Sequence, residues 1–296
     1  MSVRGRLVTY QMRRQHMKQR VKDFVINEGA PLPELAAGSF ADNLQVATRN
    51  VFGAGITTVS EANPQRKHLI YVHGPNFAAV SLQKHAELVT EVIKQTNVTV
   101  SYLDFPMPPV HNCETVLPFI VNAYDYLHVQ YPGDRFFLMG DSGGAGLILA
   151  MLQKLRATNA TMPVGTILLS PWTDFSMSNP DLIVSANDDP FMAYDVLRTI
   201  GRQYAGEWST TDPKVSPFYG TFDHLGAILL DYGTSDLIAP DIERLTAKLI
   251  TAKQTAVQVH KQQGMWHDYV LWNDLPETKK TIKAISRFVT ADGEVN

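Results

Sequence analysis

One serine in this sequence lies in the pattern Gly-x-Ser-x-Gly, which can mark a nucleophile. Residues 135–140 form a run that is apolar after Arg135 and ends with Gly140. Directly after it come Asp141, Ser142, Gly143 and Gly144. Small residues flank a serine in this way where the chain turns sharply from a strand into a helix and exposes the hydroxyl. A plain glycine turn is the simpler interpretation of so short a pattern, and the strand-to-helix context argues against it. The sequence therefore predicts Ser142 as a nucleophile.

A nucleophilic serine needs a base, and the base needs a carboxylate that orients it. In strand–serine–helix enzymes these partners follow in the chain order Ser, Asp or Glu, His, in loops after later strands. Asp236 lies just past the apolar run 226–231, and His267 lies just past the run 256–260. Both order and placement predict the triad Ser142, Asp236 and His267.

Other residues compete for these roles. Asp231 closes its apolar run, whereas Asp236 lies in the following loop, so we favour Asp236 as the acid. His260 also ends a run, and we expect a hydrogen-bonded structural histidine there. The remaining histidines, including His111 and His224, have the wrong order or lie in the wrong element. A satisfied surface histidine is the alternative interpretation of His267.

The segment 71–77 is the candidate for further oxyanion donors. A loop at this place donates N–H groups through a His-Gly-Gly-Gly-type motif in such enzymes. Here His73 and Gly74 are followed by Pro75 and Asn76. Proline has no N–H, and losing one oxyanion donor can cost about 10²–10³ in rate. We expect the oxyanion hole to use Gly143, with Asn76 or, if the loop shifts, Gly74.

The elements that must position these residues alternate along the chain. Short apolar runs are separated by helical patterns near 78–96, 114–130, 143–158 and 240–253, and another follows at 275–289. Alternating strands and helices with nearly continuous apolar strands predict an α/β fold, with a mostly parallel sheet covered by helices on both faces. Such sheets place their sites at the carboxyl ends of the strands. The runs are His68–His73, Val98–Asp104, Arg135–Gly140, Gly165–Ser170, Gly226–Asp231 and Ala256–His260.

Two segments do not fit the alternation, and we expect them to form a shared cap over the site. The first is residues 1–45. The second runs from Ser170 to about Phe222, with several prolines and a helical stretch at 191–204. Insertions of this size at strand ends often form lids. We predict a cap segment at 1–45 and a main domain at 46–296, with a second cap insertion at about 175–220.

Residues 1–22 hold seven Lys and Arg and no acid. Leu7, Tyr10, Met17, Val21 and Phe24 recur at helical spacing. We expect this helix to dock its apolar face on the protein. Contact with an anionic membrane and use as a transit peptide are the alternatives.

The composition excludes several classes of protein. A net charge of −3 over 296 residues argues against nucleic-acid binding. The single cysteine, Cys113, cannot form an internal disulfide, which predicts a reducing compartment. No run approaches the 18 or so apolar residues of a membrane span, and we see no signal-peptide pattern. We expect a cytoplasmic protein without stable membrane insertion. No Cys/His ligand spacing suggests a metal, and we expect no cofactor.

Taken together, these motifs resemble the hormone-sensitive-lipase-like esterase family. The resemblance implies an α/β-hydrolase fold with a helical cap and hydrolysis of carboxylic esters with modest acyl chains. It also implies Ser142 as nucleophile, His267 as base and Asp236 as its partner. The motifs that carry it are HG at 73–74, GDSGG at 140–144, SPWTD at 170–174, SPFY at 216–219, GTSDLIAPD at 233–241 and GMWHDY at 264–269.

The sequence thus predicts a serine hydrolase, an esterase for small or short-acyl esters that uses an acyl-enzyme mechanism. One alternative is a catalytically weak ligand-binding protein on a hydrolase scaffold, which Pro75 favours. Another is cleavage of amides or acetylated sugars by the same triad. The expected partner is a small ester substrate, and a homodimer is possible through an edge strand.

Overall fold

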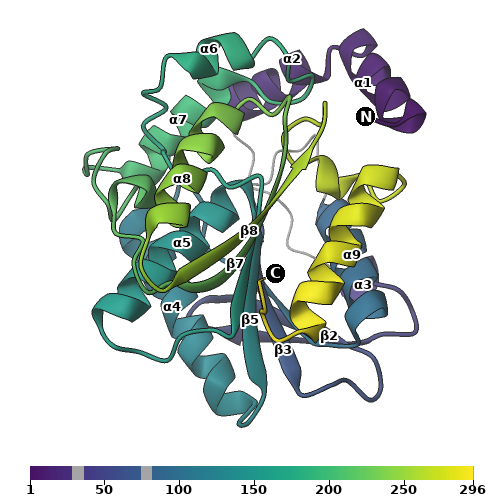
Figure 1. Cartoon of the computed structure of the whole chain (residues 1–296), viewed down its shortest axis with the longest axis vertical. Helices are drawn as coiled ribbons and strands as arrows, with labels where there is room; N and C mark the ends of the chain where they lie inside the picture. The colour runs from purple at the N-terminus through teal and green to yellow at the C-terminus, as the bar shows by residue number, and fades with distance from the viewer. Residues whose placement is uncertain (29–36, 75–81, 296) are drawn as a thin grey trace.

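The computed structural model describes residues 1–28, 37–74 and 82–295, and a single sheet forms the centre of this part of the chain (Figure 1). All six predicted apolar runs are strands of that sheet. Its strands are β1 (Gln45–Val51), β2 (Ala54–Ser60), β3 (Lys67–Val72), β4 (Thr99–Asp104), β5 (Arg135–Asp141), β6 (Gly165–Leu169), β7 (Gly226–Gly233) and β8 (Thr255–Gln262).

The strands lie in the order β1-β2-β4-β3-β5-β6-β7-β8. All pairs from β4 to β8 are parallel, which puts their carboxyl ends at one edge. The central strands β5 and β6 are almost wholly buried, as expected for strands covered on both faces. The predicted α/β fold with a mostly parallel sheet is confirmed.

The antiparallel pair of β1 and β2 is a difference from the sequence analysis. β1 is mostly exposed and mixes polar with apolar residues, so it forms no apolar run. Phe52 and Gly53 connect the two strands, both with positive φ (+55° and +83°), as a two-residue hairpin turn requires.

Helices cover both faces of the sheet. Figure 1 shows α3 and α9 on one side and α4, α5 and α8 on the other. Side-chain caps fix some of the ends: the Asn112 side chain accepts from the Glu114 N–H (3.0 Å) at the start of α4. Among the described residues, no helix is long and apolar enough to cross a membrane. The helices are α1 (Val3–Arg14), α2 (Met17–Asp23), α3 (Leu82–Thr96), α4 (Cys113–Gln130), α5 (Ser142–Ala157), α6 (Asp181–Ser185), α7 (Tyr194–Ala205), α8 (Ala239–Thr251) and α9 (Pro276–Thr290).

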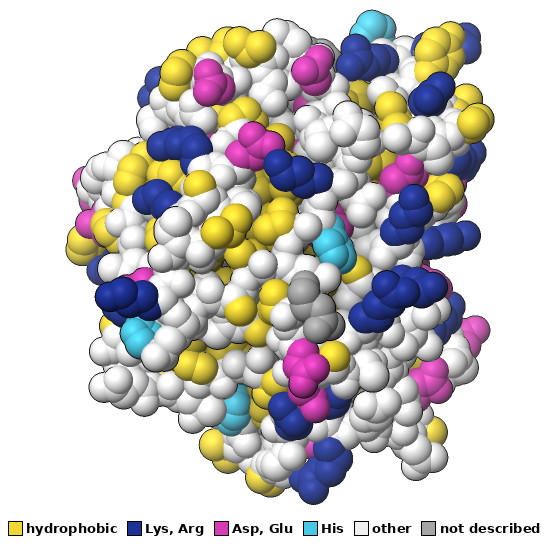
Figure 2. Space-filling view, in the orientation of Figure 1, with side chains coloured by type: hydrophobic (Ala, Val, Ile, Leu, Met, Phe, Trp, Pro, Cys, Tyr) yellow, Lys and Arg dark blue, Asp and Glu magenta, His cyan; other side chains and the backbone are white. Residues whose placement is uncertain are grey.

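The two segments outside the alternation meet at one end of the sheet, at the top of Figure 1, where α2 lies beside α7 and α1 contacts α9. Lys18 donates to the carbonyl of Ala186, and Lys22 forms an ion pair with Asp195 in α7. Figure 2 shows Lys and Arg side chains over the surface of α1 and α2. These are the contacts that a shared cap would require, and the domain boundaries themselves stay a prediction.

The N-terminal segment docks, and the predicted stripe is correct only after residue 16, where Val21 is buried and Met17 packs against the core. Val8 and Met12 are buried, whereas Leu7 and Tyr10 are 45% and 61% exposed. His16 has φ +51° and breaks the helix between α1 and α2. Because this break changes the direction in which side chains point, the apolar face of α1 does not continue the apolar face of α2.

We expect Met12→Ala to loosen α1. Truncating a buried methionine costs about 2 kcal/mol, which raises the population of the undocked helix about thirtyfold. Trypsin cleavage after Arg13 and Arg14 measures this opening. Tyr10→Ala, on the exposed face, is the matched control, and equal cleavage rates for both variants would contradict the docking.

Candidate active site

The predicted nucleophile lies at a tight turn between a strand and a helix. Ser142 follows β5 directly and opens α5, with φ +48°. A Cβ added at Gly140 would lie 2.8 Å from the Val72 carbonyl oxygen, and one at Gly144 would lie 2.1 Å from the same atom. Only glycine fits at both positions, because α5 is pressed against the carboxyl end of β3. The Gly-x-Ser-x-Gly pattern is thus a steric requirement of this turn.

The structure brings the three predicted triad residues together. His267 Nε2 lies 2.8 Å from Ser142 Oγ, and His267 Nδ1 lies 3.0 Å from Asp236 Oδ1. All three side chains are buried. In the neutral imidazole, the carboxylate requires the proton on Nδ1, which leaves Nε2 to accept the serine hydroxyl. This is the geometry that activates a serine.

The electrostatics of the site favour a protonated histidine. Burial alone lowers the pKa of His267, but the carboxylates of Asp236, Asp268 and Asp189 outweigh it and raise the pKa to about 10. A carboxylate at hydrogen-bond distance stabilises the imidazolium, which is the form that appears when the histidine has taken the serine proton.

Asp231, the competing acid, belongs to another network. Its carboxylate accepts from the Tyr269 hydroxyl and from Thr281 Oγ1 (3.0 Å). Burial raises the pKa of Asp231 to about 7. His260 contacts the Gln258 amide (3.2 Å), in keeping with a structural histidine. Asp231 therefore ties the segment after His267 to α9, and it is not the partner of His267.

The loop after β3 is held by Asp141. The Gly74 N–H donates to Asp141 Oδ2 (3.0 Å), and the Tyr71 hydroxyl donates to Oδ1 of the same carboxylate. His73 Nδ1 lies 2.7 Å from the Gly74 carbonyl oxygen, and burial lowers its pKa to about 4, so this ring is neutral. The Gly74 amide is thus occupied, which argues against its predicted role as an oxyanion donor.

Asn76 and Gly143 are the other two predicted oxyanion donors. Pro75 and Asn76 lie outside the described residues. Gly143 lies in the first turn of α5, where N–H groups have no partner within the helix, and it lines the pocket beside Ser142. Its N–H remains the best-placed candidate for an oxyanion donor.

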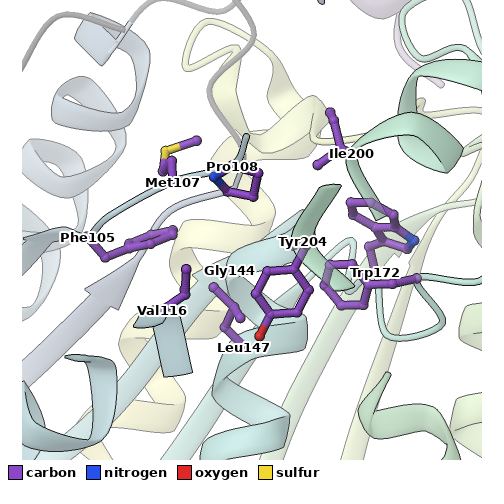
Figure 3. Close-up of a pocket in the computed structure, with 11 residues that line it drawn as sticks. Phe105, Met107, Pro108, Val116, Gly144, Leu147, Trp172, Ile200 and Tyr204 are labelled. Atoms are coloured by element: carbon purple, nitrogen blue, oxygen red, sulfur yellow. The ribbon is translucent and has the colours of Figure 1, made fainter. Parts of the chain in front are cut away.

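A pocket with apolar walls lies beside Gly143 and Gly144, the two residues that follow Ser142 (Figure 3). Its cavity volume is about 30 Å³. It lies between the start of α5, the segment after β4, and α7 of the cap region. Its walls include Phe105, Met107, Pro108, Val116, Leu147, Trp172, Phe175, Ile200 and Tyr204.

Sequence reasoning missed Asp189, a buried carboxylate under the site. Oδ2 accepts from the backbone N–H groups of His267 and Leu237 (both 3.0 Å), and Oδ1 accepts from Phe191 (2.7 Å) and Met192 (2.9 Å). One side chain of the 170–222 excursion therefore joins the loops that carry Asp236 and His267. The Asp189–Pro190 pair is a turn signal, but nothing local in the sequence links it to those loops. A second missed carboxylate, Asp268, directly follows His267 and lies 3.2 Å from Nε2.

We expect Asp189→Asn to slow the reaction of Ser142 with a fluorophosphonate. The asparagine side chain has one acceptor oxygen where Asp189 has two, so one of the two pairs of backbone N–H groups loses its acceptor. We expect the loop that carries His267 to shift as a result. The maximal labelling rate should fall between about tenfold and a hundredfold. The probe concentration for half-maximal rate should not change, because the pocket is untouched. Asp188→Asn, at the exposed neighbouring residue, is the control, and equal rates in the two variants would contradict the role of Asp189.

Comparisons with known proteins agree with this geometry. Residues 69–271 match the model of a family described as alpha/beta hydrolase fold. An esterase of Acinetobacter venetianus is 30% identical over 260 residues, which cover 85% of this chain and 84% of that protein. An acetyl-hydrolase of Streptomyces hygroscopicus is 28% identical and covers 85% of this chain and 86% of its own.

Among solved structures, the hormone-sensitive-lipase (HSL) homologue EstE7 from a metagenome library has a TM-score of 0.84. It is 22% identical, and the match covers 99% of both chains. At this identity the likeness supports the fold alone. With more than half of the chain matched by the family model, the protein belongs to the α/β-hydrolase fold family, and the resemblance predicted from its motifs is confirmed.

Proposed function

We propose that this protein is a serine carboxylesterase that hydrolyses esters with short or modest acyl chains. One observation carries the proposal: Ser142 Oγ lies 2.8 Å from His267 Nε2, and the same ring is hydrogen-bonded to Asp236. The next residue, Gly143, lines an apolar pocket. The curated relatives named esterase and acetyl-hydrolase support the same class of reaction.

The reaction begins with attack of Ser142 Oγ on the ester carbonyl carbon. His267 Nε2 takes the serine proton, and Asp236 stabilises the resulting imidazolium. The Gly143 N–H donates to the oxyanion at the positive end of α5. As the carbon–oxygen bond to the alcohol breaks, Nε2 returns the proton to the leaving oxygen. Water then attacks the acyl-enzyme and gives a proton to His267 Nε2. As the bond between the acyl carbon and Ser142 Oγ breaks, Nε2 returns this proton to Oγ, and the acid is released.

We place the acyl group against the apolar walls of this pocket. Among the described residues its lining offers hydrophobic contact and no charged side chain, which favours an acyl chain over a polar or ionic group. The cap helix α7 contributes Ile200 and Tyr204 to these walls, which gives the cap a part in selecting the acyl chain.

A cytoplasmic location and a small ester as the main partner are part of the proposal. Support for a reducing compartment comes from Cys113, which is buried and is the single cysteine of the chain. The homodimer and the absence of nucleic-acid binding stay predictions.

Hydrolysis of p-nitrophenyl acetate and butyrate by wild type and Ser142→Ala is the first test, together with fluorophosphonate labelling. Turnover and labelling should both disappear in the variant, because the nucleophile is gone. Labelling of the wild type without turnover would favour the weak ligand-binding alternative, which the occupied Gly74 amide supports. A wild type with neither signal would contradict the esterase.

A second test concerns the acyl pocket. Val116→Phe adds bulk at a buried wall position of α4 and should lower the ratio of butyrate to acetate hydrolysis about tenfold, since two methylenes of contact are lost. Val129→Phe is the matched control on the same helix, because Val129 is 74% exposed. An unchanged ratio in Val116→Phe would mean that the acyl chain binds elsewhere.

A further inference from the structure

The imidazole of His267 lies between two carboxylates. Asp236 Oδ1 is 3.0 Å from Nδ1, and Asp268 Oδ2 is 3.2 Å from Nε2, on the side where Ser142 reacts. The Asp268 side chain is 7% exposed. Its other oxygen, Oδ1, has no hydrogen-bond partner among the described residues. This second carboxylate is not needed to orient the ring, so it must have another effect on Nε2.

The backbone directs Asp268 toward Nε2. Asp268 has φ +53°, in the left-handed region that only a few residue types tolerate, and its N–H donates to Ser170 Oγ (3.3 Å). Because Ser170 follows β6, the carboxyl end of the sheet fixes this conformation. The side chain is thereby placed in the site, where it is buried.

A proton must lie between Asp268 and Nε2 for this contact to be favourable. Neutral imidazole with its proton on Nδ1 presents a lone pair at Nε2, which repels a carboxylate oxygen. The contact is attractive if Nε2 bears a proton, or if Asp268 is protonated and donates to Nε2. Both arrangements contain the same shared proton. In both, the Nε2 lone pair is occupied and cannot accept the proton of Ser142.

The other carboxylates facing the histidine have donors of their own. Asp189 accepts four backbone N–H groups, and Asp141 accepts from Tyr71 and Gly74. Asp236 accepts from the Ile238 N–H (2.9 Å) as well as from the ring. Within the described part of the chain, the proton at Nε2 is the one partner available to the Asp268 carboxylate. Burial raises the pKa of Asp268 and adds to the affinity of the pair for this proton.

We propose that Asp268 shares a proton with His267 Nε2 in the resting enzyme, and that Ser142 becomes a nucleophile when this proton leaves to solvent. Loss of one proton gives neutral His267 beside the Asp268 carboxylate. Ser142 then gives its own proton to Nε2 as Oγ forms the bond to the acyl carbon. The new imidazolium lies again beside Asp268, which stabilises it. The inference rests on the proposed function.

The direction of the pH effect follows from charge. A negative charge beside Nε2 favours the protonated ring, so the pH at which Ser142 becomes reactive is raised. Removing that charge should lower the midpoint of the pH–rate profile by about 1 to 3 pH units. Asp268→Asn keeps the shape of the side chain and removes the charge. Asp268→Gly removes the carboxyl group and tolerates the positive φ, and it avoids a new amide donor to Nε2.

The experiment measures the rate of fluorophosphonate labelling against pH for wild type, both variants, and Asp274→Asn. Asp274 is 49% exposed, pairs with Arg4 and serves as the matched control on the same segment. The NMR titration of the imidazolium N–H signal in the free enzyme gives the midpoint without any reaction. We expect lower midpoints in both Asp268 variants by both readouts, and an unchanged midpoint in the control.

The outcomes separate this inference from the proposed function. Labelling of all proteins with the same midpoint would overturn the role of Asp268 and leave the esterase intact. Loss of labelling at every pH in both folded Asp268 variants would also overturn it, because the freed base should be more reactive at low pH. A wild type that labels at no pH would instead contradict the nucleophile.

Discussion

The contact of α5 with the carboxyl end of β3 is the constraint on which the rest of the site depends. Gly144 lies so close to the carbonyl oxygens of Val72 and His73 that no side chain fits between them. This closeness forces Ser142 into a positive φ, a strain of about 1–3 kcal/mol that the buried packing around α5 must offset. Ser142 and Gly143, the predicted oxyanion donor, are the first two residues of this helix, so backbone packing sets the position of both.

The loops that complete the site are set by buried charge. Four carboxylates, Asp141, Asp189, Asp236 and Asp268, lie around the ring of His267. A buried carboxylate without donors is very unfavourable, so each one fixes the groups that satisfy it. Asp141 accepts from the Gly74 N–H, and Asp189 accepts from the N–H groups of Leu237 and His267, so these two charges join loops that lie far apart in the sequence. The arrangement that makes the site reactive is thus also the one that specifies the loop conformations.

The sequence predicted the elements and the triad well because their signals are local. Buried parallel strands are nearly continuous apolar runs, and the residues just past them fall at one edge of the sheet. The β1–β2 hairpin carries no such run, since β1 faces solvent. Asp189 could not be predicted, because its role exists only through N–H groups contributed by loops far along the chain. The predicted apolar stripe of the N-terminal helix failed at His16, because this residue has a left-handed conformation and interrupts the helix between α1 and α2.

The surplus of carboxylates has opposite effects on stability and on catalysis. The folded-state pKa of His267 is raised to about 10, above the ordinary value of 6.5. Its charge therefore stabilises the fold fully below about pH 6.5, and this contribution is lost as the pH rises through about 10. Catalysis needs the reverse, since only the deprotonated Nε2 accepts the serine proton. As the pH rises, the site gains a base and loses the ion pairs that hold its loops, so the same carboxylates that assemble the site oppose its activation.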